Sequence, residues 1–157
     1  MATFIIESNG RIEKTAVYYN GEQIGGLREV LINLDEDGTF DVVISYEGVD
    51  GVERSKSIFD GTPEKIKFVE PSFTEDEAAE LTKFVIDSDG DIDDTDLFIN
   101  DEILDGVVSV YVHIKTEKAK KNGIAGIFKK AETTMSDFRS EITYRNEDDT
   151  TETERIF

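Results

Sequence analysis

The chain has 157 residues, with 36 Asp and Glu against 17 Lys and Arg, and a net charge of −19. Such a molecule repels nucleic acid and anionic lipid and attracts cations, so we expect neither direct nucleic-acid binding nor membrane binding. The absence of cysteine excludes disulfides, thiolate zinc sites and cysteine nucleophiles. No apolar run approaches the roughly 20 residues of a membrane span, and the first residues do not read as a secretory signal. We therefore expect a cytoplasmic protein.

An internal repeat organises the chain. Residues 84–114 align without a gap to residues 4–34 at an offset of 80, and ten of the 31 positions are identical. Phe138–Tyr144 matches Phe40–Tyr46 at an offset of 98, so the second copy contains an insertion of 18 residues (98 − 80). Self-similarity of this kind is typical of duplication. We predict two tandem repeats, 1–59 and 84–157, that share one core and are joined by a connector at 60–83.

Alternation of apolar and polar residues predicts a mainly β fold. Asn9-Gly10 lies between two apolar runs and predicts a tight type I′ hairpin turn, which Asp89-Gly90 repeats. About five antiparallel strands in each repeat would form a sandwich or a barrel-like structure. The side chains expected in the core are Phe4, Ile6, Ile12, Val30, Ile32, Leu34 and Ile44, together with their repeat partners.

Two segments lie outside the repeat. In the connector, Thr74 and Glu77 form a capping-box pattern, which predicts a short helix over about Glu75–Lys83. The second segment is a basic insertion at 115–132. Residues 115–131 hold six Lys and one Glu, net +5, which leaves −24 on the remaining chain (−19 − 5). Two glycines in it weaken a helix, so both a helix and a loop remain open.

Residues 87–96, DSDGDIDDTD, resemble the calcium-binding loop of EF-hand proteins. With Gly90 at the sixth position of that loop, its first position falls on Val85, which cannot ligate a metal, and the flanking segments are predicted strands. The resemblance implies weak calcium binding as one alternative function, and we expect no other cofactor. The carboxylates that would supply ligands are Asp87, Asp89, Asp91, Asp93 and Asp96.

No motif in the sequence predicts catalysis. His113 is the only histidine and lies on the polar side of a predicted strand, so we interpret it as a surface residue. No second histidine completes a transition-metal site, and there is no nucleophile elbow, P-loop or dinucleotide-binding motif. We expect a non-enzymatic protein.

The charge pattern favours protein–protein binding. Carboxylates on a rigid β framework can imitate a phosphate backbone, so we hypothesise an inhibitor or nucleic-acid mimic that engages a basic protein. The alternative is a structural or assembly component, for example of a virion. Tyr19–Leu27 is similar to hairpins of some phage tail and baseplate proteins, and the Lys-rich insertion could join copies into a homo-oligomer. The residues expected to make these contacts are Lys118, Lys120, Lys121, Lys129, Lys130, Asp148, Asp149 and Glu152.

Overall fold

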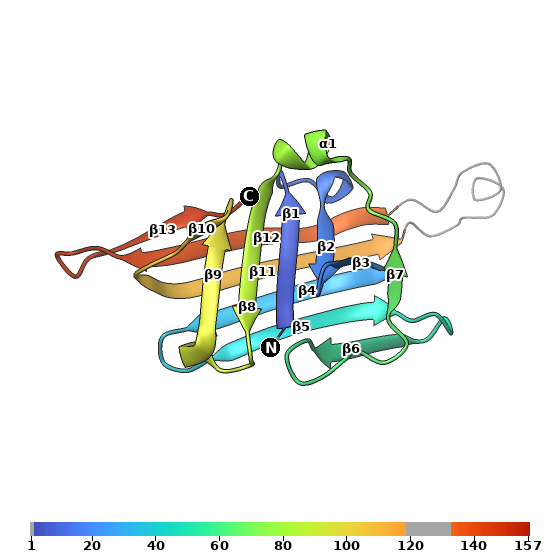
Figure 1. The fold of residues 1–157 in the computed structure, drawn as a ribbon, viewed down its shortest axis with the longest axis horizontal. Coiled ribbons are helices and arrows are strands. Elements are labelled where there is room, and N and C mark those ends of the chain that lie inside the picture. The colour runs from blue at the N-terminus through green and yellow to red at the C-terminus, as the bar shows by residue number, and fades with distance from the viewer. Residues whose placement is uncertain (1, 119–132) are drawn as a thin grey trace.

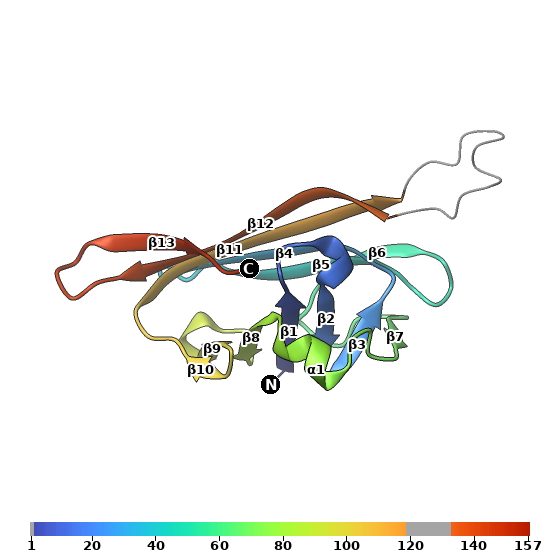
Figure 2. The ribbon, with the colours of Figure 1, turned by 90° about the horizontal axis from the view of Figure 1, so that it is seen from above.

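The computed structural model of the chain describes residues 2–118 and 133–157, and side chains within 2–116 and 137–157. Its strands form two antiparallel sheets that face one another as two layers, and the strands of one sheet cross those of the other (Figures 1 and 2). The predicted mainly β, antiparallel architecture is therefore confirmed.

Sheet A has the strand order β10-β9-β8-β1-β2-β3-β7. Its strands are β1 (Ala2–Ser8), β2 (Ala16–Tyr19), β3 (Glu22–Gly25), β7 (Lys67–Val69), β8 (Thr82–Ser88), β9 (Thr95–Ile99) and β10 (Glu102–Ile103). Its central pair, β1 and β8, joins the first repeat to the second, while β7 comes from the connector.

Sheet B has the strand order β13-β12-β11-β4-β5-β6. Its strands are β4 (Leu27–Asp35), β5 (Phe40–Glu47), β6 (Glu53–Ser57), β11 (Val107–Lys118), β12 (Thr133–Arg145) and β13 (Thr151–Arg155). Its central pair, β4 and β11, again joins the two repeats. Each sheet thus contains strands of both repeats, with six strands per repeat within the described residues rather than the five expected.

The connector helix α1 (Glu75–Ala79) has the predicted capping box. The Thr74 hydroxyl accepts a hydrogen bond from the Glu77 amide at 3.2 Å, and the Glu77 carboxylate accepts one from the Thr74 amide at 3.1 Å. The helix ends at Ala79 instead of Lys83, because the chain from Thr82 onward pairs with β1 as strand β8. The predicted length was wrong because strand pairing overrides local helix preference. No helix in the described part of the chain is long and apolar enough to cross a membrane.

The predicted type I′ hairpin turns were also wrong. That turn needs positive φ at both central residues, whereas only the glycines have it, at +93° for Gly10 and +108° for Gly90. Each glycine amide instead donates to the hydroxyl of Ser8 or Ser88, at 3.0 and 2.9 Å. Short 3-10 turns, η1 (Ile12–Lys14) and η2 (Ile92–Asp94), then complete the two connections.

The core lies between the two sheets. Its predicted members in β1, β4 and β5 and their repeat partners are all at most 4% exposed. Ile12 and Ile92 are the exceptions, because they belong to η1 and η2 at the margin of the sheets and are only partly buried against the core. Alternation along the strands therefore predicted the inward faces correctly.

Equivalent hydrogen bonds occur in both repeats. Ser8 Oγ lies 2.7 Å from Thr15 Oγ1, and Ser88 Oγ lies 2.6 Å from Thr95 Oγ1. Both threonine hydroxyls also donate to a backbone carbonyl four residues earlier, at 2.6 Å in each case. The duplication itself stays a prediction, which these matching contacts support.

The start of the basic insertion differs from the prediction. Residues 115–118, the described part of the insertion, continue strand β11 and pair with β12, which begins at Thr133 directly after the insertion. Lys118 is the last residue of β11. The other four predicted contact lysines, Lys120, Lys121, Lys129 and Lys130, lie outside the described residues.

Candidate interaction site

Two clefts form at equivalent places in the two repeats, each lined by residues of both sheets. The repeat-1 cleft has a volume of about 320 Å³ and the repeat-2 cleft about 390 Å³. Of the 13 residues that line the repeat-1 cleft, 12 have a repeat partner, at an offset of 80, in the lining of the repeat-2 cleft. The fold therefore forms a cleft at the same place in each repeat, and the two clefts differ in the side chains that line them.

The repeat-2 cleft combines apolar side chains with carboxylates. Seven of its lining residues are apolar, among them Leu97 and Ile103, and no Lys or Arg belongs to the described lining. Its carboxylates are Asp35, Glu36, Asp93, Asp96 and Asp105. The charge of the lining is therefore −5, beside apolar surface that can contact the aliphatic part of a ligand.

The repeat-1 cleft is nearly neutral. Its charged lining residues are one Arg and two Glu, which give −1 (1 − 2). Arg28 of this cleft corresponds to Val108 in the other, and Ala16 corresponds to Asp96. Clefts with equivalent linings thus carry nearly balanced charge in one repeat and unbalanced negative charge in the other.

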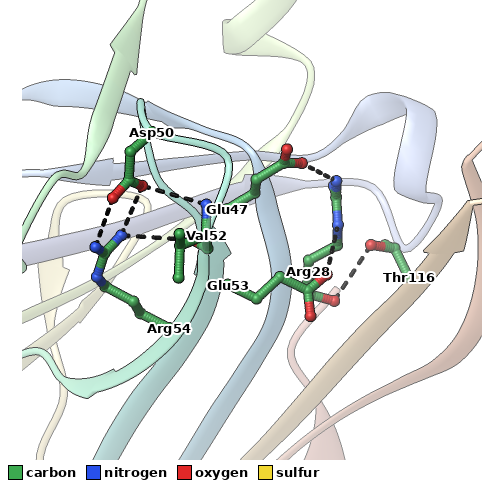
Figure 3. A network of polar contacts seen from close by, with 7 residues as sticks. All are labelled: Arg28, Glu47, Asp50, Val52, Glu53, Arg54 and Thr116. Atoms are coloured by element: carbon green, nitrogen blue, oxygen red, sulfur yellow. Dashed lines mark hydrogen bonds and ion pairs between the residues drawn. The ribbon is translucent and has the colours of Figure 1, made fainter.

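Ion pairs within the chain neutralise the cations near the repeat-1 cleft (Figure 3). Arg28 Nη2 lies 2.6 Å from Glu47 Oε2, and Arg28 Nε lies 3.9 Å from Glu53 Oε1. Arg54 binds both carboxylate oxygens of Asp50, at 2.9 and 2.7 Å. A larger groove of about 870 Å³ on this side has three cations and three carboxylates in its lining. The described lining of this groove therefore carries no net charge.

The repeat-2 cleft has one cation at its margin. Arg145, the repeat partner of Glu47 at an offset of 98, binds Glu36 through two contacts of 2.7 and 3.0 Å. The other four lining carboxylates form no ion pair with Lys or Arg among residues 2–118 and 133–157. Most of the negative charge of this cleft is thus available to a ligand.

The charge difference extends beyond the clefts. Residues 84–114 contain nine Asp and Glu and no Lys or Arg, whereas residues 4–34 contain four Glu and three Lys or Arg. The aligned segments therefore carry −9 and −1 (3 − 4). Repulsion from Asp89, followed by burial and by repulsion from Asp91, raises the pKa of Asp94 above its ordinary value. The second repeat is crowded with negative charge.

The carboxylates of the EF-hand-like loop are distributed over several structural roles. The Asp89 and Asp91 side chains each accept the backbone amide two residues later, at 3.1 and 3.0 Å. Asp93 and Asp96 line the repeat-2 cleft, while Asp87 lies on β8 and accepts a long hydrogen bond from Thr3. Within the described residues no three Asp, Glu or His side chains form a metal-binding group. Calcium binding stays an untested prediction.

The acidic residues predicted near the C-terminus lie outside the cleft lining but at the same end of the molecule. Asp148 and Asp149 form the turn between β12 and β13, where Asp148 accepts both the amide and the hydroxyl of Thr150. Glu152 is exposed on β13, the edge strand of sheet B. Figure 1 shows this turn at the left, on the side of β9 and β10, whereas β11 ends at the right. The described part of the Lys-rich insertion therefore lies far from this acidic end.

The environment of His113 differs from that of the surface residue predicted from the strand pattern. Its Nε2 lies 2.7 Å from Glu29 Oε2 on β4, and its Nδ1 contacts the Asp137 carboxylate on β12. The side chain is only 22% exposed, and the hydrogen bond to Glu29, then that to Asp137, raises its pKa. When protonated, the ring donates from both nitrogens and has no lone pair to accept a proton. This arrangement is suited to an ion pair between three strands rather than to general-base chemistry.

No protein-family model, no curated protein and no solved structure matches this chain in the comparisons made. The function of the protein is therefore inferred from the chemistry of the site.

Proposed function

We propose that the protein is a non-enzymatic binding protein whose second repeat engages a basic protein partner, in the manner of an inhibitor or nucleic-acid mimic. One observation carries the proposal: two aligned segments build the same cleft, yet one carries −9 and the other −1. Acidity that served only solubility would need no such concentration in one repeat. A partner rich in Arg or Lys is the ligand that this charge selects. The absence of cysteine supports a cytoplasmic location for this binding.

The test is a binding panel of purified nucleic-acid-binding proteins with basic surfaces, set against acidic proteins of similar size. We expect binding to basic members only, weakened between about 50 and 500 mM salt because exposed charges are then screened. We also expect duplex DNA to compete for the same partner. Binding to no basic member, or equal binding to the acidic ones, would refute the proposal.

A matched pair of variants locates the binding on the molecule. Asp93→Asn with Asp96→Asn removes two charges from repeat 2, and Glu13→Gln with Glu22→Gln removes two exposed charges from repeat 1. Exposed ion pairs contribute about 0.2–1 kcal/mol each, so the loss of two should weaken binding of the repeat-2 variant about two- to thirtyfold. An equal loss in both variants would mean that net charge alone, and not the second repeat, determines binding.

Self-assembly is the second candidate function. The described part of the insertion, which carries +5 in residues 115–131, lies at the end of the molecule opposite the acidic β12–β13 turn (Figure 1). That placement favours head-to-tail contact between copies. Light scattering at low and high salt tests it, with Lys120, Lys121, Lys129 and Lys130 changed to Glu. An unchanged monomer mass under all conditions would exclude assembly through this segment.

A further inference from the structure

A row of apolar side chains crosses the outer face of sheet A, which is turned toward the reader in Figure 1 and away from sheet B. Strand register places Ile103, Phe98, Val85, Ile5 and Tyr18 directly beside one another on β10, β9, β8, β1 and β2. None of the five belongs to the core or packs against it. Ile103 is 57% exposed, and the other four are partly exposed. No described element covers the middle of this face.

The apolar row ends at Tyr18. The next position in the register is Gln23, which is 7% exposed and exchanges two hydrogen bonds with Ser72. Neighbouring strands lie about 4.8 Å apart, so the five strands give a row of about 19 Å. An α-helix of about 13 residues has that length.

Outer faces of antiparallel sheets are ordinarily polar, and exposed apolar patches mark interaction sites. Sheet B shows the ordinary pattern: the row through the middle of its outer face runs Arg139, His113, Leu31, Val43 and Ser57. Only two of those five side chains are apolar. The apolar row on the outer face of sheet A therefore indicates a binding surface.

Charge beside the row indicates which occupant fits. Asp87 and Asp96 pair directly on the same face, one step along the strands from Val85 and Phe98. Ile103 also lines the repeat-2 cleft, so the row is continuous with the acidic cavity. A second copy docked here would set these carboxylates against their equals, with −19 on each chain. A segment with Lys or Arg beside apolar residues meets both features.

We propose that the apolar row of sheet A is a docking surface for an amphipathic helix of a partner protein, with apolar residues flanked by Lys or Arg and a contact segment of about 13 residues. This inference rests on the proposed function, since the carboxylates select the basic partner. It adds the place and the chemistry of the apolar contact.

The test uses a dye-labelled synthetic helix of about 13 residues that contains Leu on one face and Lys on the flanks, with binding measured by fluorescence anisotropy. The row variant is Phe98→Ser with Ile103→Ser. The matched control is Leu31→Ser with Val43→Ser, a directly paired apolar couple on the outer face of sheet B that also lies outside the core. Loss of two buried apolar contacts should weaken binding at least about tenfold in the row variant, and less than about twofold in the control.

Three further measurements distinguish the possible outcomes. Ile103→Ser alone, on a short edge strand, preserves the fold if the double variant does not, and circular dichroism checks both. The Asp93→Asn, Asp96→Asn variant in the same assay separates the two proposals: weaker binding there with an unchanged row variant overturns the docking surface and leaves the proposed function intact. Unchanged binding in both variants overturns both. A dimer in sedimentation equilibrium that the row variant dissociates would also overturn the inference, since the occupant would then be a second copy.

Discussion

Replacing His113 by Gln should lower stability mainly at mildly acidic pH. The imidazole lies between the Glu29 and Asp137 carboxylates, with 22% of the side chain exposed. A hydrogen bond to a charged group contributes about 1.5–3 kcal/mol when well shielded, and exposure to water reduces that contribution. The two contacts together should therefore contribute about 1–3 kcal/mol to the free energy of unfolding at pH 6.

The sign of the pH dependence follows from the direction of the pKa shift. The Glu29 hydrogen bond, then that of Asp137, raises the pKa of folded His113 above its ordinary value of 6.5. The stabilisation is fully present below the unfolded pKa and is lost as the pH rises through the higher folded pKa.

Urea unfolding of wild type and the His113→Gln variant between about pH 5.5 and 9 measures the effect. Tyrosine fluorescence and circular dichroism report unfolding, because the chain has five Tyr and no Trp. Asn33→Gln, an exposed non-titrating change on β4, is the control and should give a small difference that does not vary with pH. A stability difference for His113→Gln that stays constant across the whole range would refute the ion-pair assignment.

Further predictions concern the repeats. Gly26→Ala should cost more stability than Gly106→Ala, and each at least about 1 kcal/mol, because both have positive φ and the added Cβ would lie 2.6 and 3.2 Å from a carbonyl oxygen. Chemical denaturation ranks the two. Ile86→Ala, at a fully buried position, should cost about 2–5 kcal/mol in the same assay. Asp94→Asn should raise the melting temperature at pH 7 but not near pH 3, since repulsion led by Asp89 raises the pKa of Asp94 and destabilises the ionised form. Titration calorimetry with millimolar calcium should give heat from the wild type if the acidic loop binds it, and none would end that alternative.

Alternation along a strand was sufficient to predict which side chains enter the core. Val110 and Val112 are fully buried, and His113 between Val112 and Ile114 points to the other face, as expected. Alternation cannot say which strands become neighbours. Glu29 reaches His113 only because β4 pairs with β11 in one particular register, and that register depends on contacts 84 residues apart in sequence.

The local predictions failed where tertiary structure offered a better partner. Asn9-Gly10 is a strong signal for a type I′ turn. In the structure the Gly10 amide instead donates to the Ser8 hydroxyl, and the 3-10 turn η1 leads the chain into β2. The clefts were missed for a related reason: each is lined by both sheets, and the sequence does not show how the sheets meet. If the lining of one cleft were known, the offset of 80 would predict most of the lining of the other.

Residues that are identical in the two repeats lie mostly at positions that maintain the fold. Most identical positions have a structural role that both copies share: Phe4, Ile6 and Val30 in the core, Ser8, Thr15 and Asn20 in hydrogen bonds, and Gly10 and Gly26 at positive φ. Glu22 and Glu102 are identical without a structural reason that we can name.

Difference between the repeats follows the clefts. Arg28 corresponds to Val108, and Ala16 to Asp96, at positions that line a cleft in both repeats. A lining charge of −5 in one cleft against −1 in the other is what the proposed binding function of the second repeat predicts. The repeat-1 cleft serves as an internal control. The variant Ala16→Asp with Arg28→Val should give this cleft affinity for the basic partners of the second repeat. If the variant gains no affinity, charge in the cleft does not determine binding.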